Sequence, residues 1–100
     1  MEEIPADIAQ TITEAALQAI DNAVRHSKAS QIRLRLGSAT QSGLVIEVSD
    51  NGLGFTPERL PKDRLGISTS IKARMELIGG EAQVLSEPGA GTTVMLRWAK

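Results

Sequence analysis

The sequence predicts an α+β domain, a two-layer α/β sandwich in which helices cover one face of a mixed, mainly antiparallel sheet. Two observations support this fold class. Two segments repeat apolar residues at helical spacing, and four short segments alternate apolar with polar residues as strands with one covered face do. Because each amphipathic element must bury its apolar side, we expect the helices to pack against the sheet.

The first half of the chain is predicted to form a helix and a hairpin. Apolar residues recur at helical spacing over residues 8–24, and the polar run 27–30 ends the pattern. Residues 32–36 then alternate apolar side chains with arginine, residues 37–43 have the composition of a turn, and residues 44–50 alternate again. This order predicts one long helix followed by two antiparallel strands.

The second half is predicted to begin with a long loop. Residues 52–65 place glycine, proline and charged residues in no regular order, which is typical of a mobile cover. A second helical stripe follows over residues 67–78 and stops at the glycine pair 79–80. Alternation over residues 82–86 and 92–98 then predicts a second hairpin.

Composition and charge restrict the class of partner. One hundred residues, of which 41% are hydrophobic and 23% charged, fit a single soluble domain over residues 1–100. The net charge of -1 and the two aromatic residues, Phe55 and Trp98, offer neither a field nor a stacking platform for nucleic acid. No apolar run is long enough to span a membrane. We therefore expect a cytoplasmic domain without direct membrane contact, which a membrane-bound sensor could carry on its cytoplasmic side.

The segment D-N-G-L-G-F at residues 50–55 is the first candidate site. Asp50 continues the parity of the covered strand residues, so its carboxylate should face the covered side and can accept a hydrogen bond from an exocyclic amine. Gly52 and Gly54 allow the backbone to turn sharply or to lie against a ligand. An Asp-Asn-Gly turn is also a common strand terminator, so this segment alone fits both interpretations.

A polar side of the first helix is the second candidate. Gln18, Asn22, Arg25 and His26 share this side of an otherwise apolar element. The amide oxygen of Asn22 is a suitable hard ligand for Mg²⁺, and Arg25 one turn later can neutralise a phosphate. The alternative is a solvated helix end at which Asn22 bonds to backbone.

Two further glycine segments complete the set. Residues 64–71, R-L-G-I-S-T-S-I, bring a glycine loop to the start of the second helix, where free amides favour an anion such as phosphate. The hydroxyls of residues 68–70 fit plain helix capping equally well. Residues 89–94, G-A-G-T-T-V, form a hairpin turn that also directs the Thr92 hydroxyl to the covered face, within reach of Asp50 or a bound base.

Taken together, these motifs resemble the ordered motif set of the Bergerat-fold (GHKL) ATPases, which include gyrase, heat-shock chaperone ATPases, histidine kinases and mismatch-repair ATPases. The resemblance covers residues 10–98. Its motifs are Asn22 with Arg25 and His26, D-x-G-x-G at 50–54, R-L-G-I at 64–67 and G-x-G-T at 89–92. The helix sequence LQAIDNAVRHSKAS is similar to that of histidine kinases of the nitrate-sensor type, and anti-sigma serine kinases have a similar helix.

The resemblance implies a pocket for ATP and Mg²⁺. Asn22 would coordinate Mg²⁺, Arg25 would meet the phosphates and His26 would lie near the ribose. Asp50 would bind the adenine amino group, and Thr92 would support it through water. The other cofactor-binding residues that the resemblance implies are Gly52, Gly54, Phe55, Leu65, Gly66 and Ile67.

The resemblance also implies an ATP-dependent protein histidine kinase. Such a domain donates the γ-phosphoryl group to a histidine on a separate dimerisation domain of the same kinase, and a response regulator is its indirect partner in two-component signalling. That dimerisation and phosphoacceptor domain is absent from residues 1–100, so we expect this chain alone to transfer little phosphate. Two alternatives remain, an anti-sigma-type serine kinase and a non-catalytic nucleotide-binding regulatory module.

The catalytic positions implied by the resemblance are Gln18, Asn22 and Arg25, and Gln18 departs from the family pattern. Many relatives have a glutamate there, and an amide cannot act as a general base. This departure affects hydrolysis by an activated water more than transfer to a histidine, because a neutral imidazole is itself a nucleophile. The segment 66–74 is also one residue longer than in the nitrate-sensor type.

Overall fold

The computed structural model describes residues 4–26, 28–37, 43–53, 62–86 and 89–99, with the side chains of residues 26 and 62–68 excepted. The elements in chain order are α1 (Ala6–His26), β1 (Ile32–Gly37), β2 (Gly43–Asp50), α2 (Lys62–Leu77), β3 (Glu81–Ser86) and β4 (Thr92–Ala99). The predicted order of helix, hairpin, helix and hairpin is confirmed.

The strands form one sheet in the order β1-β2-β4-β3. Every neighbouring pair is antiparallel, so the predicted mainly antiparallel sheet is confirmed, and the described strands pair without a parallel neighbour. The two hairpins lie side by side because β2 pairs with β4, with Val48 opposite Val94 and Asp50 opposite Thr92. The second and fourth strands are therefore central, and β1 and β3 are the edges of the described sheet.

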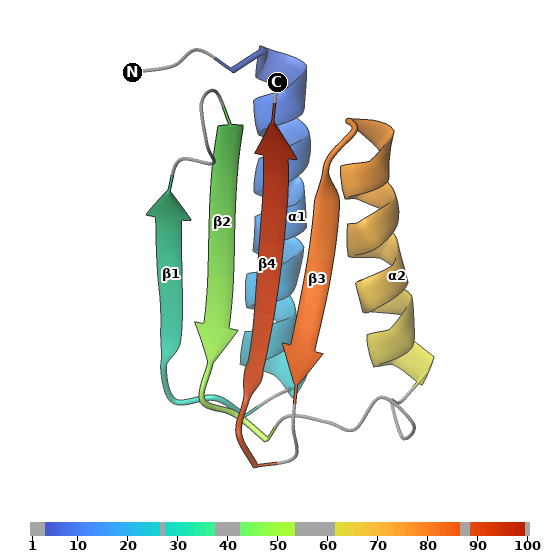
Figure 1. The fold of residues 1–100 in the computed structure, drawn as a ribbon. Helices are drawn as coiled ribbons and strands as arrows, with labels where there is room; N and C mark the ends of the chain where they lie inside the picture. The colour runs from blue at the N-terminus through green and yellow to red at the C-terminus, as the bar shows by residue number, and fades with distance from the viewer. Residues whose placement is uncertain (1–3, 27, 38–42, 54–61, 87–88, 100) are drawn as a thin grey trace.

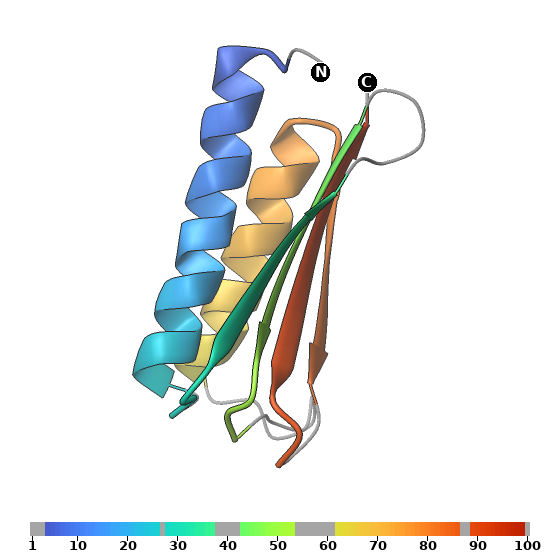
Figure 2. The same ribbon diagram turned by 90° about the vertical axis from the view of Figure 1, so that its left-hand side faces the viewer.

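Both helices lie on one face of the sheet, as Figure 2 shows, and the predicted two-layer arrangement is confirmed. Helix α1 packs against β2, β4 and α2, whereas α2 packs mainly against β3 and α1. The edge strand β1 lies beyond the part of the sheet that the helices cover (Figure 1). Its apolar residues share the inward parity of β2 but are exposed, with Leu34 at 51% and Leu36 at 68%.

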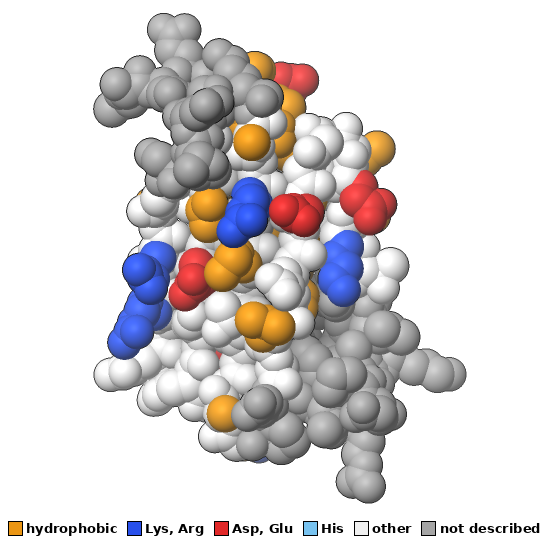
Figure 3. All heavy atoms as spheres, viewed as in Figure 1, with side chains coloured by type: hydrophobic (Ala, Val, Ile, Leu, Met, Phe, Trp, Pro, Cys, Tyr) orange, Lys and Arg blue, Asp and Glu red, His pale blue; other side chains and the backbone are white. Residues whose placement is uncertain are grey.

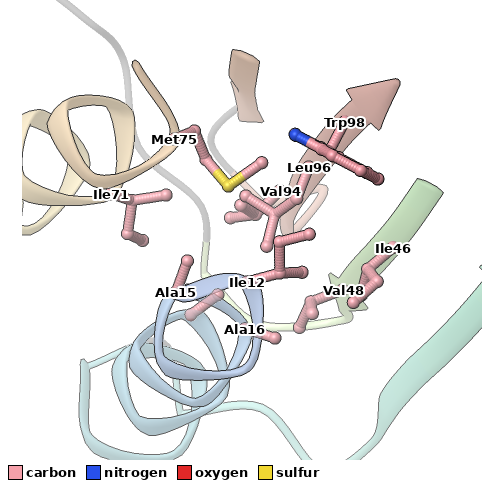
Figure 4. Packing of buried hydrophobic residues seen from close by; sticks show 11 residues of the cluster. Ile12, Ala15, Ala16, Ile46, Val48, Ile71, Met75, Val94, Leu96 and Trp98 are labelled. Carbon is pink, nitrogen blue, oxygen red and sulfur yellow. The ribbon is translucent and has the colours of Figure 1, made fainter. Parts of the chain in front are cut away.

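The core fills the space between the two layers (Figure 4). Small residues of α1, such as Ala15 and Ala19, let the helix approach the sheet closely, and α2 contributes Ile71 and Met75. Full burial of one such apolar side chain stabilises the fold by about 1.5–3 kcal/mol. The buried members of the cluster are Ile12, Ala15, Ala16, Ala19, Ile46, Val48, Ile71, Met75, Val94, Leu96 and Trp98.

The ends of α1 follow local backbone chemistry. The helix begins after Pro5, whose carbonyl oxygen accepts a hydrogen bond from the Ala9 amide at 2.9 Å. Proline is tolerated at such a start because a missing N–H costs nothing there. Lys28, just beyond the helix, has a positive φ of 52° and turns the chain toward β1. The observed helix, Ala6–His26, extends the predicted one by a few residues at each end.

Helix α2 begins earlier than the sequence analysis predicted. It spans Lys62–Leu77, so residues 62–65 are helical rather than part of the long loop, and the R-L-G-I motif lies within the first turns. Residues 54–61 of that predicted mobile cover lie outside the described residues. The predicted glycine stop is confirmed. Gly79 has a φ of 76°, and the Gly80 and Gly79 amides donate to the carbonyl oxygens of Met75 and Glu76, which is a Schellman motif.

The second face of the sheet is covered by neither described helix and displays basic and acidic side chains interspersed with apolar ones (Figure 3). The strand register places on this face the side chains of Arg33, Arg35, Glu47, Gln83 and Arg97. Arg97 lies 3.9 Å from Glu81 in an exposed ion pair. Such a mixed face provides no single-sign field for nucleic acid. Among the described residues, neither helix is long and apolar enough to cross a membrane.

Candidate functional site

A row of polar side chains crosses one end of the sheet on its helix-covered face. The pairing places Asp50 of β2 opposite Thr92 of β4, and Thr92 opposite Ser86 of β3. The next row inward is wholly apolar, with Val48, Val94 and Val84 in the same three strands. The hydrophobic core therefore gives way to hydrogen-bonding groups at this end. The last turns of α1 and the first turn of α2 lie at the same end (Figures 1 and 2).

Asp50 presents a carboxylate at the end of β2. Its Oδ1 atom accepts a hydrogen bond from the Gly52 amide at 2.8 Å, which fixes the carboxylate in a tight turn. Within the described part of the chain, Oδ2 makes no hydrogen bond. A half-buried carboxylate oxygen without a protein partner can accept a hydrogen bond from a ligand's amino group.

Thr92 is 4% exposed and faces the same interior side. The Ser86 hydroxyl donates to the Gly91 carbonyl oxygen at 3.0 Å and lies 2.9 Å from Thr92 Oγ1. Since Ser86 has one hydroxyl hydrogen, Thr92 donates to Ser86 when Ser86 donates to Gly91. In this arrangement the lone pairs of Thr92 Oγ1 can accept a hydrogen bond from a water or an amine.

Asn22 of α1 is a buried polar side chain in an apolar helix face. It is 9% exposed, and both Ala19, one turn earlier on the same face, and the adjacent Ala23 belong to the buried core. The Oδ1 atom is buried and has no hydrogen-bond partner within the described part of the structure. An unsatisfied buried acceptor of this kind costs about 1–3 kcal/mol, so its presence points to a ligand. A neutral amide oxygen is a suitable ligand for Mg²⁺, and the residue therefore fits the metal implied by the sequence.

Asn22 and Asp50 face the same side of the sheet. Asp50 shares the parity of Ile46 and Val48, which belong to the core beneath α1, and Asn22 lies on the buried side of that helix. Strand parity predicts the side that Asp50 faces, whereas the burial of Asn22 is a finding of the structure. The base-recognition candidate and the metal-ligand candidate thus lie on two facing layers of the same domain.

Gln18 and Arg25, the other predicted site residues of α1 whose side chains are described, have protein partners. Gln18 is half-buried, and its Oε1 atom accepts a 3.4 Å hydrogen bond from Nε of Arg74 in α2. The Nη1 atom of the same arginine donates to Glu14 Oε2 at 2.8 Å. Arg25 is 70% exposed and pairs with Asp21 at 2.7 Å, one turn earlier. Gln18 therefore links the two helices, and the structure places Arg25 on the outer surface rather than beside Asn22. His26 is the last residue of α1, and its side chain lies outside the described residues.

The predicted glycine positions are described in part. Gly52 is buried directly after β2, whereas Gly54 and Phe55 lie outside the described residues. The backbone of Leu65, Gly66 and Ile67 belongs to the first turns of α2. A helix start at this end of the molecule supplies amide groups that favour an anion.

Gly91 has a role that the sequence analysis treated only as a turn. Its φ of 81° is favourable for glycine, and a Cβ atom at this position would collide with the backbone oxygen of Asp50. The start of β4 therefore lies directly against the end of β2. This close approach explains why the second glycine of G-A-G-T precedes Thr92, and the G-x-G spacing was the available signal.

Asn51 is a further residue that the sequence analysis missed. Its Oδ1 atom accepts hydrogen bonds from the Ser30 and Gln31 amides, each at 3.0 Å, and its Nδ2 group donates to Ser30 Oγ at 2.9 Å. The Asn51 amide also donates to the Gln31 carbonyl oxygen at 3.3 Å. These contacts join the end of β2 to the connection between α1 and β1. The sequence signal was the asparagine in D-N-G, but its partners lie about twenty residues away.

Comparison with known proteins gives consistent results. Residues 7–100 match the family of histidine kinase-, DNA gyrase B- and HSP90-like ATPases. The sensor histidine kinase LiaS of Bacillus subtilis is 39% identical over 80 residues, which make up 80% of this chain and 22% of LiaS. The nitrate/nitrite sensor protein NarQ of Escherichia coli is 28% identical over 94 residues, or 94% of this chain and 16% of NarQ. The chain thus spans less than a quarter of either relative.

Solved structures share the fold. The histidine kinase domain of the blue-light activated kinase EL346 from Erythrobacter litoralis has a TM-score of 0.78 at 22% identity, covering 96% of this chain and 46% of that one. Full-length ShkA in complex with AMPPNP has a TM-score of 0.71 at 22% identity, covering 87% of this chain and 21% of that one. At this identity the likeness concerns the fold, and the sequence match gives the assignment. The chain belongs to the histidine kinase-, DNA gyrase B- and HSP90-like ATPase family.

Proposed function

We propose that residues 1–100 are the ATP-binding catalytic domain of a sensor histidine kinase. The domain binds ATP with Mg²⁺ and donates the γ-phosphoryl group to a histidine on a separate dimerisation domain of the same kinase. The observation that carries this proposal is the buried Oδ1 atom of Asn22, which has no partner among the described residues. It faces the same side as the Oδ2 atom of Asp50, which also makes no hydrogen bond there. The names of the relatives, including LiaS and NarQ, support a sensor kinase over an anti-sigma serine kinase.

Base recognition depends on the polar row at the end of the sheet. Asp50 accepts a hydrogen bond from the exocyclic amino group of adenine, and Thr92 acts as an acceptor for a bridging water. Guanine has a carbonyl oxygen at the corresponding ring position, which would face the carboxylate without a hydrogen between them. Such a site discriminates against guanine because its polar groups would be left unpaired.

The phosphates lie between α1 and the start of α2 in this proposal. Asn22 holds Mg²⁺ through its amide oxygen, and the metal neutralises phosphate charge when it is bound. Because α2 begins at Lys62, its unpaired amides are those of its first turn, and these donate to phosphate oxygens. Leu65, Gly66 and Ile67 follow that turn directly. Arg25 reaches them by leaving Asp21, because an exposed ion pair contributes only about 0–1 kcal/mol.

Transfer requires alignment more than acid–base chemistry. A neutral imidazole nitrogen on the dimerisation domain attacks the γ-phosphorus, a nitrogen–phosphorus bond forms, and ADP leaves with the electrons of the broken phosphorus–oxygen bond. Gln18 is compatible with this step because the attacking group needs no general base in its neutral form. The amide of Gln18 instead bonds to Arg74 and keeps the two helices in place.

The partners of the whole protein follow from this function. The chain spans less than a quarter of LiaS, so the histidine-bearing dimerisation domain belongs to the remainder of such a kinase. A response regulator then receives the phosphoryl group indirectly. The domain acts in the cytoplasm, alone or as the cytoplasmic part of a membrane-bound sensor.

The substitution Asp50→Asn tests the proposal. The asparagine retains an oxygen for the Gly52 amide, but one of its two polar atoms is now a donor that cannot pair with the adenine amino group. Loss of a hydrogen bond to a charged acceptor costs about 1.5–3 kcal/mol. We therefore expect affinity for a non-hydrolysable ATP analogue with Mg²⁺ to fall roughly 10- to 150-fold in isothermal titration. Asp7→Asn, an exposed site in the first turn of α1, is the matched control. Unchanged affinity in Asp50→Asn would refute the adenine contact.

A further inference from the structure

We infer that Asn51 is a positioning residue that holds the Asp50 carboxylate in register with the adenine amino group and thereby sets base specificity. This inference rests on the proposed function. Asn51 does not contact the nucleotide in this account, because its side chain is directed to the connection between α1 and β1. Its effect on the nucleotide passes through the backbone of the adjacent Asp50.

The side chain of Asn51 is anchored at both of its polar atoms. Two backbone amides, of Ser30 and Gln31, donate to Oδ1 at 3.0 Å each, and Nδ2 donates to Ser30 Oγ at 2.9 Å. The orientation of the side-chain amide is fixed by these partners, because a backbone N–H can only donate. The backbone amide of Asn51 donates to the Gln31 carbonyl oxygen at 3.3 Å. One residue therefore binds the neighbouring connection through four hydrogen bonds.

The carboxylate of Asp50 has much less support of its own. Among the described residues, its side chain accepts one hydrogen bond, from the Gly52 amide, which lies two residues further along the chain. The direction of the carboxylate therefore depends on the path of the backbone between these two residues, and Asn51 is the residue between them. On the opposite side, Gly91 lies against the backbone oxygen of Asp50. The turn after β2 is thus held on one side by β4 and on the other by the connection between α1 and β1, to which Asn51 binds.

The anchor also couples the two halves of the proposed site. The connection between α1 and β1, to which Asn51 binds, follows directly from the end of α1, the helix that carries Asn22. Lys28, with its positive φ, lies in this connection. A shift of the β2 end relative to α1 would change the distance between the adenine contact and the metal ligand. The contacts of Asn51 oppose that shift.

A ligand comparison separates this role from simple stabilisation of the turn. Purine riboside triphosphate lacks the exocyclic amino group of ATP, so it cannot use the Asp50 carboxylate. If Asn51 acts through Asp50, then Asn51→Ala weakens ATP but has little effect on purine riboside triphosphate. A general loss of structure would weaken both ligands by the same factor.

The experiment is isothermal titration of the full chain with each triphosphate and Mg²⁺, at a temperature where Trp98 fluorescence shows each variant to be folded. We expect Asn51→Ala to lower the affinity for ATP roughly tenfold, which is the lower end of the effect of one hydrogen bond to a charged group. Affinity for purine riboside triphosphate should change less than about twofold, since no contact with that ligand is removed. Equal weakening of both ligands, or no weakening of ATP, overturns the inference.

Ser30→Ala serves as the graded variant. It removes only the Oγ partner of Nδ2 and keeps both amide contacts to Oδ1. We expect the preference for ATP over purine riboside triphosphate to fall by roughly two- to threefold, as for one weak neutral hydrogen bond. If Asn51→Ala does not fold, Ser30→Ala becomes the test of the inference. An unchanged preference of Ser30→Ala for ATP over purine riboside triphosphate then overturns it. Failure of Asp50→Asn to weaken ATP would instead overturn the proposed function, so the two failures are distinguishable.

Discussion

Replacing Asn22 with leucine should stabilise the domain and abolish binding of ATP with Mg²⁺. The residue is 9% exposed, and its Oδ1 atom is buried without a partner in the described structure. Leucine has a similar volume and leaves no polar atom to satisfy. The substitution therefore removes a free-energy penalty that, in the proposed function, is offset when the oxygen binds the metal.

The size of the effect follows from this burial. An unsatisfied buried acceptor costs about 1–3 kcal/mol, and leucine adds a few tenths through better helix propensity. We expect the free energy of unfolding of Asn22→Leu to rise by about 1–3 kcal/mol. For a domain of this size, each kcal/mol corresponds to an increase in Tm of about 4–8 °C.

Urea unfolding followed by fluorescence measures this change directly. Trp98 is the only tryptophan, is 7% exposed, and donates to the Ile78 carbonyl oxygen in the core, so its emission reports tertiary unfolding. Titration with an ATP analogue and Mg²⁺ on the same samples measures binding. Gln10→Leu on the exposed side of α1 is the control, and its stability should change by less than about 0.5 kcal/mol. A destabilised Asn22→Leu, or one that binds normally, would refute the reasoning.

Two paired substitutions test the packing that supports the site. Leu96→Ala, at a residue 1% exposed, should cost about 2–5 kcal/mol in urea unfolding, whereas Leu36→Ala, at 68% exposure, should cost less than about 1 kcal/mol. Similar losses in both would place β1 in the core. Gly91→Ala should destabilise more than Gly89→Ala by at least about 1 kcal/mol, because both have a positive φ but only a Cβ on Gly91 would collide with Asp50. Equal effects would show that the close approach is relaxed in solution.

Most of the fold could be predicted from the sequence because each element has a clear period. The alternation in β2 and β4 identified the inward residues, and helical spacing identified the buried face of α1. The start of α2 could not be predicted, since residues 62–66 contain charged residues and a glycine and show no apolar stripe. The exposure of Leu34 and Leu36 also could not be predicted from the sequence. Parity states which side a residue faces but not whether a helix covers it.

The candidate site was predictable where a local pattern determined it. Parity placed Asp50 and Thr92 on the covered face, and spacing placed Asn22 on the helix. The partners of Gln18 and Asn51 could not be predicted, because Arg74 and Ser30 are distant in the sequence and meet them only after folding. The same limit applies to pairing between hairpins, which brings Asp50 opposite Thr92.

The most direct test of the account is a crystal structure of the chain with a non-hydrolysable ATP analogue and Mn²⁺ as an anomalous substitute for Mg²⁺. The account predicts the adenine amino group at the carboxylate of Asp50 and the anomalous peak at the Oδ1 atom of Asn22. An analogue bound on the helix-free face of the sheet, or a metal peak away from Asn22, would contradict it.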